Sequence, residues 1–246
     1  MARGVRGFLA EKGVTLSPKI YFIDALSYMA LGLFSSLLMG LIVKTLGQQL
    51  GWESFVELGS FAMKPEIVGG AIGVAIAASL KAPPLILFSA VFVGAFGNNI
   101  GGPAGAYVAV LIAVELTKLI YKSTKLDIII VPFIAFLVGF WIAKWIGIPI
   151  HDLMRGLGDL INWATEQRPL VMSILVATVM GLALTAPISS AALSFMLGLD
   201  GFAAGAAVIG CSAQMIGFAT SSYRDNGFGG LIAQGVGTSM LQIANI

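Results

Sequence analysis

The sequence predicts an all-α integral membrane protein: a multi-spanning helical bundle with two interrupted, re-entrant helix hairpins and internal repeats. Of its 246 residues, 58% are hydrophobic and only 11% are charged, and the mean hydropathy is +0.95. A soluble domain carries about 25% charged residues. Long apolar runs are the second observation behind this prediction, and polar breaks inside two of these runs are the third.

The chain is expected to have two parts, a basic N-terminal segment (1–20) and a single transmembrane domain (21–246). The first span, 25–43, contains no charged residue. At about 1.5 Å per residue, it is long enough for a hydrocarbon core of about 30 Å. Four basic residues precede this span: Arg3, Arg6, Lys12 and Lys19. The positive-inside rule therefore places the N-terminus in the cytoplasm.

Seven further segments follow in the predicted transmembrane domain. They are a span at 66–80, a broken segment at 85–114, a span at 128–150, an amphipathic helix at 151–168, a broken segment at 169–198, and spans at 201–222 and 229–246. In 66–80, Gly69, Gly73 and Ala77 recur every four residues. Such a stripe of small residues predicts close helix packing.

The two broken segments carry the functional prediction. In the first, "GNNIGGP" (97–103) separates apolar runs that are each too short to cross a bilayer, and in the second, "TAPISSAA" interrupts the apolar run. Two pairs of prolines with similar spacings, Pro84 to Pro103 (19 residues) and Pro169 to Pro187 (18 residues), each bracket an apolar run that ends in one of these breaks. Paired interruptions of this kind are typical of a repeat-built transporter with its substrate site at the breaks.

Charge alone leaves the orientation of the segments after residue 81 open. If 85–114 is a re-entrant hairpin, Lys118, Lys122 and Lys125 stay cytoplasmic, whereas a crossing segment turns them outward and brings Lys144, Arg155 and Arg168 inside. Each orientation places three of these basic residues in the cytoplasm, so the positive-inside rule does not choose between them. The shortness of each half of the segment favours the hairpin.

Non-helical backbone at membrane depth is tolerated only where it is buried in protein or lines a watery cavity. Neutral amides and hydroxyls at such breaks both donate and accept hydrogen bonds, which suits a sugar or another polyhydroxyl compound, or a small organic anion. In the alternative interpretation, they cap ordinary loops at the bilayer surface, or, for a glutamine, join helices. The candidate substrate-binding residues are Asn98, Asn99, Thr185, Ser189, Ser190 and Gln214.

Glu115 is a candidate proton-coupling carboxylate. Because it begins the charged stretch "ELTKLIYKSTKLD", a solvated position in a loop is the favoured interpretation. His151 is interpreted as the start of the amphipathic helix, and Cys211 as a small packing residue.

The motifs of several functional classes are missing from the sequence. One histidine and one cysteine cannot form a common zinc site, and no phosphate-binding Gly-x-x-x-x-Gly-Lys-Ser/Thr loop occurs. We therefore expect no enzyme activity, no cofactor and no metal. The net charge is only +2, and the basic residues are dispersed apart from a modest N-terminal cluster. No nucleic-acid partner is therefore expected.

Three stretches resemble one family: "FGNNIGGPAGAYVAVLIAVELTKLIYKSTKLDIIIVP", "TAPISSAALSFMLGLDGFAAGAAVIGCSAQMIGFA" and "RDNGFGGLIAQGVGTSMLQIANI". They are similar to the phosphotransferase-system enzyme IIC proteins of the second type, which include PfoR-like toxin regulators. The resemblance implies a bacterial inner-membrane protein that forms a homodimer. Because family members usually continue further, it also implies a C-terminally truncated chain.

Two functions follow as expectations. The first is transport of a small polar solute, a sugar or related compound, across the lipid bilayer. The alternative is a membrane-embedded sensor or regulator that binds a similar solute without moving it. Phosphorylation of the solute would require separate soluble phosphotransferase partners, because this chain carries neither of the phosphorylatable partner domains.

Overall fold

A computed structural model describes residues 2–185 and 190–237, and every regular element in this part of the chain is helical. Four helical runs are long and apolar enough to cross a bilayer: Ile20–Leu50, Pro84–Ile120, Asp127–Gln167 and Gly201–Ser221. A bent pair, Glu53–Ala62 and Pro65–Ser79, would make a fifth span. The predicted all-α, multi-spanning fold is therefore confirmed.

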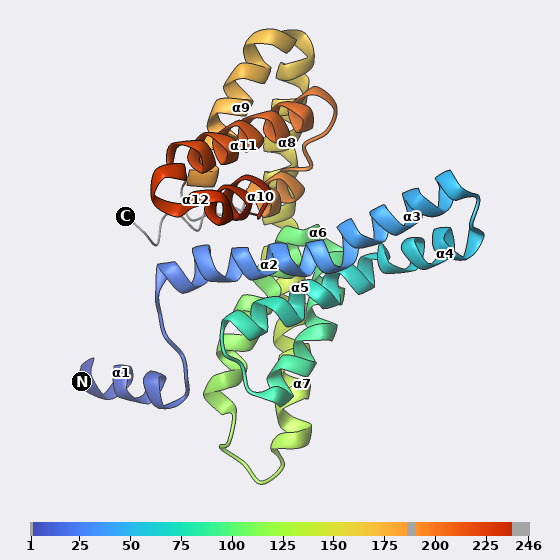
Figure 1. The fold of residues 1–246 in the computed structure, drawn as a ribbon. Coiled ribbons are helices and arrows are strands. Elements are labelled where there is room, and N and C mark those ends of the chain that lie inside the picture. The colour runs from blue at the N-terminus through green and yellow to red at the C-terminus, as the bar shows by residue number, and fades with distance from the viewer. Residues whose placement is uncertain (1, 186–189, 238–246) are drawn as a thin grey trace. The chain divides into compact units, whose positions relative to one another are not determined.

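The chain forms two compact units, Met1–Leu153 and Met154–Ile246, and each is described by itself (Figure 1). In the first unit, five helices precede the longest one: α1 (Ala2–Glu11), α2 (Ala25–Leu33), α3 (Met39–Leu50), α4 (Glu53–Ala62) and α5 (Pro65–Ser79). Helices α6 (Pro84–Ile120) and α7 (Asp127–Ile142) follow, and α8 (Ile148–Gln167) begins in this unit. Wider π-helical turns precede α2 and join α2 to α3 and α7 to α8: η1 (Ile20–Asp24), η2 (Phe34–Leu38) and η3 (Ala143–Gly147).

Glycines allow the helices of the first unit to pack closely. A Cβ atom added at Gly47 of α3 would lie 2.7 Å from the backbone nitrogen of Val56 in α4. A Cβ at Gly73 of α5 would collide with the carbonyl oxygen of Ala90 in α6, and one at Gly94 would lie 2.7 Å from the Gly73 Cα. The predicted close packing of the Gly69–Gly73 stripe is confirmed, and α5 lies against the first part of α6 in an antiparallel pair.

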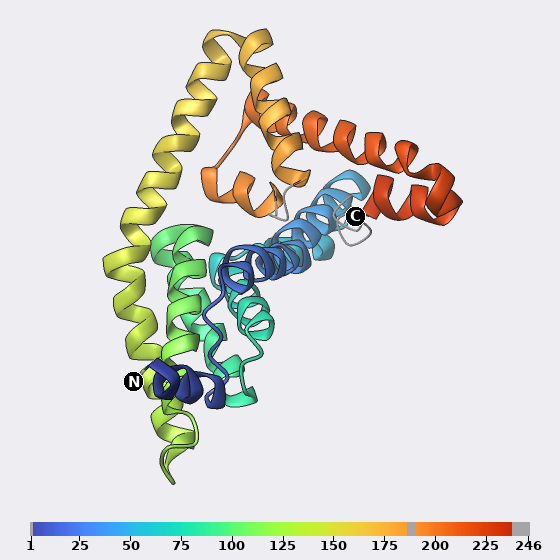
Figure 2. The same ribbon diagram turned by 90° about the vertical axis from the view of Figure 1, so that its left-hand side faces the viewer.

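Helix α6 is a hairpin of two arms. Gly101 (φ −124°, ψ 18°) and Gly102 (φ 59°, ψ −165°) leave the helical conformation, and Pro103 follows. A Cβ at Gly97 would lie 2.8 Å from the Cα of Ala106, nine residues later. Along a straight helix, nine residues would span about 13 Å. The backbone therefore reverses at Gly101–Gly102, inside the predicted break at 97–103, and Figure 2 shows the two green arms side by side.

The charged stretch that begins at Glu115 differs from its expected loop conformation, because the second arm of α6 continues to Ile120. Lys118 is only 2% exposed, and its Nζ donates to the Leu80 carbonyl (2.6 Å), to Glu115 Oε1 (3.0 Å) and to the Gly13 carbonyl (3.1 Å). The sequence interpretation of a solvated Glu115 is wrong, because this buried lysine pairs with it and allows the helix to extend.

The second unit contains the rest of α8 and the helices α9 (Pro169–Thr185), α10 (Ser190–Leu197), α11 (Gly201–Ser221) and α12 (Tyr223–Ile232), with the π-helical turn η4 (Ala233–Gly237). Helices α9 and α11 cross at small residues. A Cβ at Gly210 would collide with the Ala177 carbonyl, and one at Gly181 would lie 3.7 Å from the Gln214 Cβ. From the first contact to the second, the residue number rises on both helices, so α9 and α11 run parallel.

The second predicted break lies between α9 and α10, and its centre, residues 186–189, falls outside the described residues. The helices that flank the two breaks differ in length. The second arm of α6 runs from Pro103 to Ile120, whereas α10 has 8 residues. The internal repeat stays a prediction.

Candidate solute-binding site at the hairpin tip

The tip of the α6 hairpin lies against the start of α5. The Asn98 Nδ2 donates to the Pro65 carbonyl (2.8 Å), and the Asn99 Nδ2 donates to Glu66 Oε1 (3.1 Å). Glycine makes this approach possible, because a Cβ at Gly69 would lie 2.6 Å from the Asn98 Cβ. The two asparagines thus join the end of the first arm to the first turn of α5.

One polar atom of this contact has no partner. Asn98 Oδ1 is buried, and within the described residues no group donates a hydrogen bond to it. A buried carbonyl oxygen without a donor costs about 1–3 kcal/mol. The Asn98 amide therefore still has the capacity to accept one hydrogen bond from a hydroxyl or amide group.

The other side of the tip is formed by the segment that leads from α7 into α8. A Cβ at Gly101 would lie 3.1 Å from the carbonyl carbon of Gly147, and one at Gly102 would lie 2.8 Å from Nδ1 of His151. The imidazole of His151 therefore packs directly on the reversed backbone. Gly102 has a conformation that only glycine adopts readily, and a side chain at this position would meet the imidazole.

The tip thus gathers a carboxylate, two amides and an imidazole where the hairpin reverses. Two helices also begin here with proline, α5 at Pro65 and the second arm at Pro103. Their N-terminal dipole ends favour a negative group such as the Glu66 carboxylate. These side chains can accept and donate hydrogen bonds around a neutral, hydroxyl-rich molecule.

The structure brings together only some of the residues predicted for the site. Asn98 and Asn99 lie at the tip in the first unit, and Glu115 lies further along the second arm beside Lys118. In the second unit, Thr185 ends α9, Ser190 begins α10 and Gln214 lies on α11 near Gly181, while Ser189 is outside the described residues.

Sequence reasoning missed Glu66 and His151. Glu66 follows a proline at the start of an apolar run, and His151 is the only histidine of the chain. Both are weak signals, because their partners at the tip lie 33 or more positions away in the sequence.

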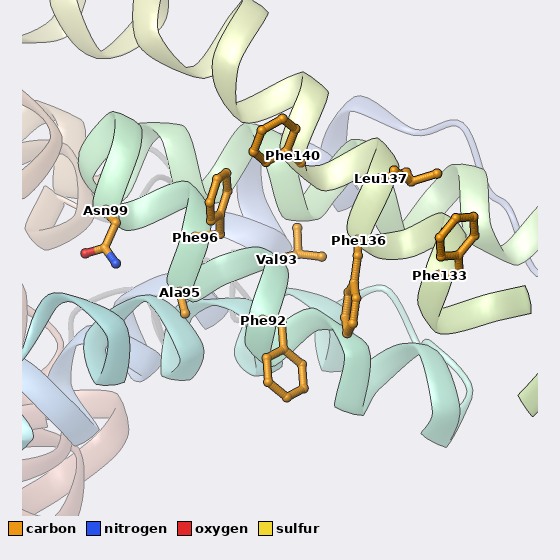
Figure 3. A pocket seen from close by; sticks show the side chains of 9 residues that line it. All are labelled: Phe92, Val93, Ala95, Phe96, Asn99, Phe133, Phe136, Leu137 and Phe140. Carbon is orange, nitrogen blue, oxygen red and sulfur yellow. The ribbon is translucent and has the colours of Figure 1, made fainter. Parts of the chain in front are cut away.

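An apolar groove runs from the tip along α6 and α7, and it has a volume of 660 Å³. Five phenylalanines line it, and Figure 3 shows them along the groove with the Asn99 amide at one end. Phe96 and Phe140 have ring centroids 4.9 Å apart, and Phe92 and Phe136 have centroids 5.2 Å apart. Apart from Asn99, every side chain that lines the groove is apolar, so it suits a hydrocarbon chain rather than a polar solute.

The family profile "Phosphotransferase system, EIIC" matches residues 23–246. This match covers both units, and the chain therefore belongs to the phosphotransferase-system enzyme IIC family. Among curated proteins and solved structures, none matches the chain significantly. Family membership and the apolar helices define a multi-pass membrane protein of the transporter type, a permease component rather than a catalytic enzyme by itself.

Proposed function

We propose that this protein binds a sugar or a related polyhydroxyl compound at the α6 hairpin tip and moves it across the membrane. The observation that supports the proposal most strongly is the reversal at Gly101–Gly102, which has polar side chains on both sides and apolar runs before and after it. Interrupted helices near the bilayer midplane are where secondary transporters hold polar substrates.

Each side chain at the tip has a proposed role in solute binding. The Glu66 carboxylate accepts hydrogen bonds from two neighbouring hydroxyl groups, as carboxylates commonly do for polyhydroxyl ligands. Asn98 Oδ1, which has no donor among the described residues, accepts a hydrogen bond from a further hydroxyl group. The His151 imidazole donates or accepts one more hydrogen bond. Since Asn99 already donates to Glu66, it holds the carboxylate in place for the solute.

The residues predicted in the second unit also keep a role in this proposal. Thr185, Ser189 and Ser190 of the second broken segment, and Gln214 of the span that follows it, would offer hydroxyl and amide groups to a polar solute. Transport would then follow from a movement that exposes the bound solute to each side of the membrane in turn. Glu115 would couple a proton to this movement.

The cellular setting completes the proposal. The family and the basic N-terminus support a bacterial inner-membrane protein with a cytoplasmic N-terminus, acting as a homodimer with separate soluble phosphotransferase components. The contacts of Lys12 with the Tyr121 carbonyl (2.8 Å) and Ser123 (2.9 Å) support a common side for the N-terminal segment and the α6–α7 link.

The proposal is tested in two steps. Thermal-shift screening of the purified protein against sugars, sugar acids and small organic anions identifies the solute, and uptake is then measured in proteoliposomes. Substitution of Asn98 and Asn99 by alanine should abolish uptake. Asn162→Ala is the matched control, because Asn162 bonds the Gly198 carbonyl in the second unit.

The outcomes separate the functions. Uptake lost at the tip and retained in the control supports transport through this site. Solute binding without any flux supports the sensor that the sequence left as an alternative. Undiminished uptake in the doubly substituted tip variant rules the site out.

A further inference from the structure

A second polar pocket lies at the opposite end of the α6 hairpin from the tip. It has a volume of 370 Å³, and its lining includes four lysines, Lys12, Lys81, Lys118 and Lys122, together with Glu11 and Tyr121. Here the N-terminal segment meets the end of α5 and the start and end of α6. No residue of the proposed solute site lines this pocket.

The pocket lies where the apolar helices end. Helix α5 stops at Ser79, the hairpin begins at Pro84 and ends at Ile120, and α7 begins at Asp127. If the hairpin enters the bilayer from this end, the pocket lies at the level of the lipid phosphates. Tyr121 also fits this level, since tyrosine is enriched at the membrane–water interface.

Two of the lysines have an unusual backbone conformation. Lys81 (φ 53°) and Lys122 (φ 59°) are the only non-glycine residues of positive φ in the described part of the chain. Each follows the C-cap residue of a helix, Leu80 or Tyr121, at a position where glycine is the common residue because it avoids the strain. Strained residues cluster at binding sites, so the presence of a lysine at both positions points to a use for their ammonium groups.

The charges of the pocket are unevenly paired. Glu115 is engaged with Lys118, and the Asp127 carboxylate accepts from the backbone N–H groups of Lys122 and Thr124. The Lys12 ammonium donates hydrogen bonds to the Tyr121 carbonyl and the Ser123 hydroxyl. Glu11 contributes the carboxylate among the residues that line the pocket. Within the described residues, neither the Lys81 nor the Lys122 ammonium forms an ion pair, which leaves positive charge for an anion.

We propose that this lysine pocket binds a phosphate group, carried either by an anionic phospholipid headgroup or by free phosphate. Lys81 and Lys122 would contact the phosphate oxygens, and the buried Lys118 would add its field. Basic pockets between membrane helices recognise phospholipid headgroups in this manner. This site is separate from the proposed solute site, so either proposal can fail alone.

The test uses the full chain purified in a neutral detergent. Titrations with dihexanoylphosphatidylglycerol, dihexanoylphosphatidylcholine and inorganic phosphate give three dissociation constants. The double variant Lys81→Gly/Lys122→Gly removes both charges and relieves the backbone strain, so it should fold. Lys125→Gln, in the same link but outside the pocket lining, is the control.

The double variant should bind the anion about thirtyfold more weakly, which corresponds to about 2 kcal/mol for two lysines near a phosphate, while Lys125→Gln changes binding little. Binding of phosphatidylglycerol alone identifies a lipid headgroup site, and binding of inorganic phosphate with equal strength identifies a free-phosphate site. Equal binding by the wild type and the double variant, or no anion binding by the wild type, would overturn the proposal.

Discussion

Single glycines and one buried lysine determine how the first unit packs. Without side chains at Gly69, Gly73 and Gly94, α5 can approach the first hairpin arm until backbone touches backbone. Between helices in a membrane the hydrophobic effect provides no driving force, so such close van der Waals contact stabilises their packing instead. Lys118 acts at the other end, where its three hydrogen bonds connect α5, α6 and the N-terminal segment.

Gly73→Ala should lower the free energy of unfolding by about 1–3 kcal/mol, because the new methyl group meets the Ala90 carbonyl and forces the helices apart. Gly205→Ala is the control, since nothing lies within 4 Å of a Cβ there and alanine gains helix propensity. Thermal unfolding of the detergent-solubilised variants measures both. Equal midpoints for the two variants would contradict the described packing.

Lys118→Met should lower the free energy of unfolding by about 3–5 kcal/mol, because it leaves the Glu115 carboxylate buried without its cation. The double variant Lys118→Met/Glu115→Gln should recover most of this loss, since it removes the unpaired charge as well. Thermal unfolding again provides the measurement. A single variant as stable as the wild type would show that Lys118 is not buried as described.

The residues that form the candidate site could be predicted only in part. Asn98 and Asn99 stand out in the sequence because two amides interrupt an apolar run. The other two polar side chains of the tip, Glu66 and His151, could not be found in this way, because they reach the tip through helix packing that depends on Gly69, Gly102 and Gly147. Local sequence indicates where a polar site begins but not which distant groups complete it.

At the scale of the elements, the hairpin is the defining feature. Its position was predictable from "GNNIGGP", since glycine and proline together disrupt helical hydrogen bonding. The length of the hairpin was not predictable, because the charges of Glu115 and Lys118 suggest a solvated loop. Only the fold shows that these two side chains pair. A further consequence is that both ends of the hairpin lie on the same side, whatever its depth in the bilayer.

Cysteine labelling tests this consequence. In a Cys211→Ser background, Ala82→Cys and Ser123→Cys should react with an impermeant maleimide from the same side of membrane vesicles. Both positions flank the hairpin at its open end. Right-side-out and inverted vesicles give the comparison, and Ser17→Cys in the N-terminal segment should follow the same pattern. Labelling of positions 82 and 123 from opposite sides would mean that α6 crosses the membrane as one helix.

At the scale of the whole molecule, composition was sufficient to predict a membrane protein, and the quoted motifs were sufficient to predict the family. The division into two units was not predictable, because no polar linker separates them and α8 runs across the boundary. The parallel contact of α9 with α11 was equally hidden, since it depends on small residues that also occur elsewhere in the chain.

The central claim is that the polar side chains of the hairpin tip bind the transported solute. The most direct measurement is the dissociation constant of the sugar that stabilises the protein most, for the wild type and for Glu66→Gln, Asn98→Ala and the control Asn162→Ala. We expect each tip variant to bind at least tenfold more weakly, as for one lost hydrogen bond to a charged group or a buried acceptor, and the control to bind as the wild type does. Equal affinities for all four proteins would contradict the claim.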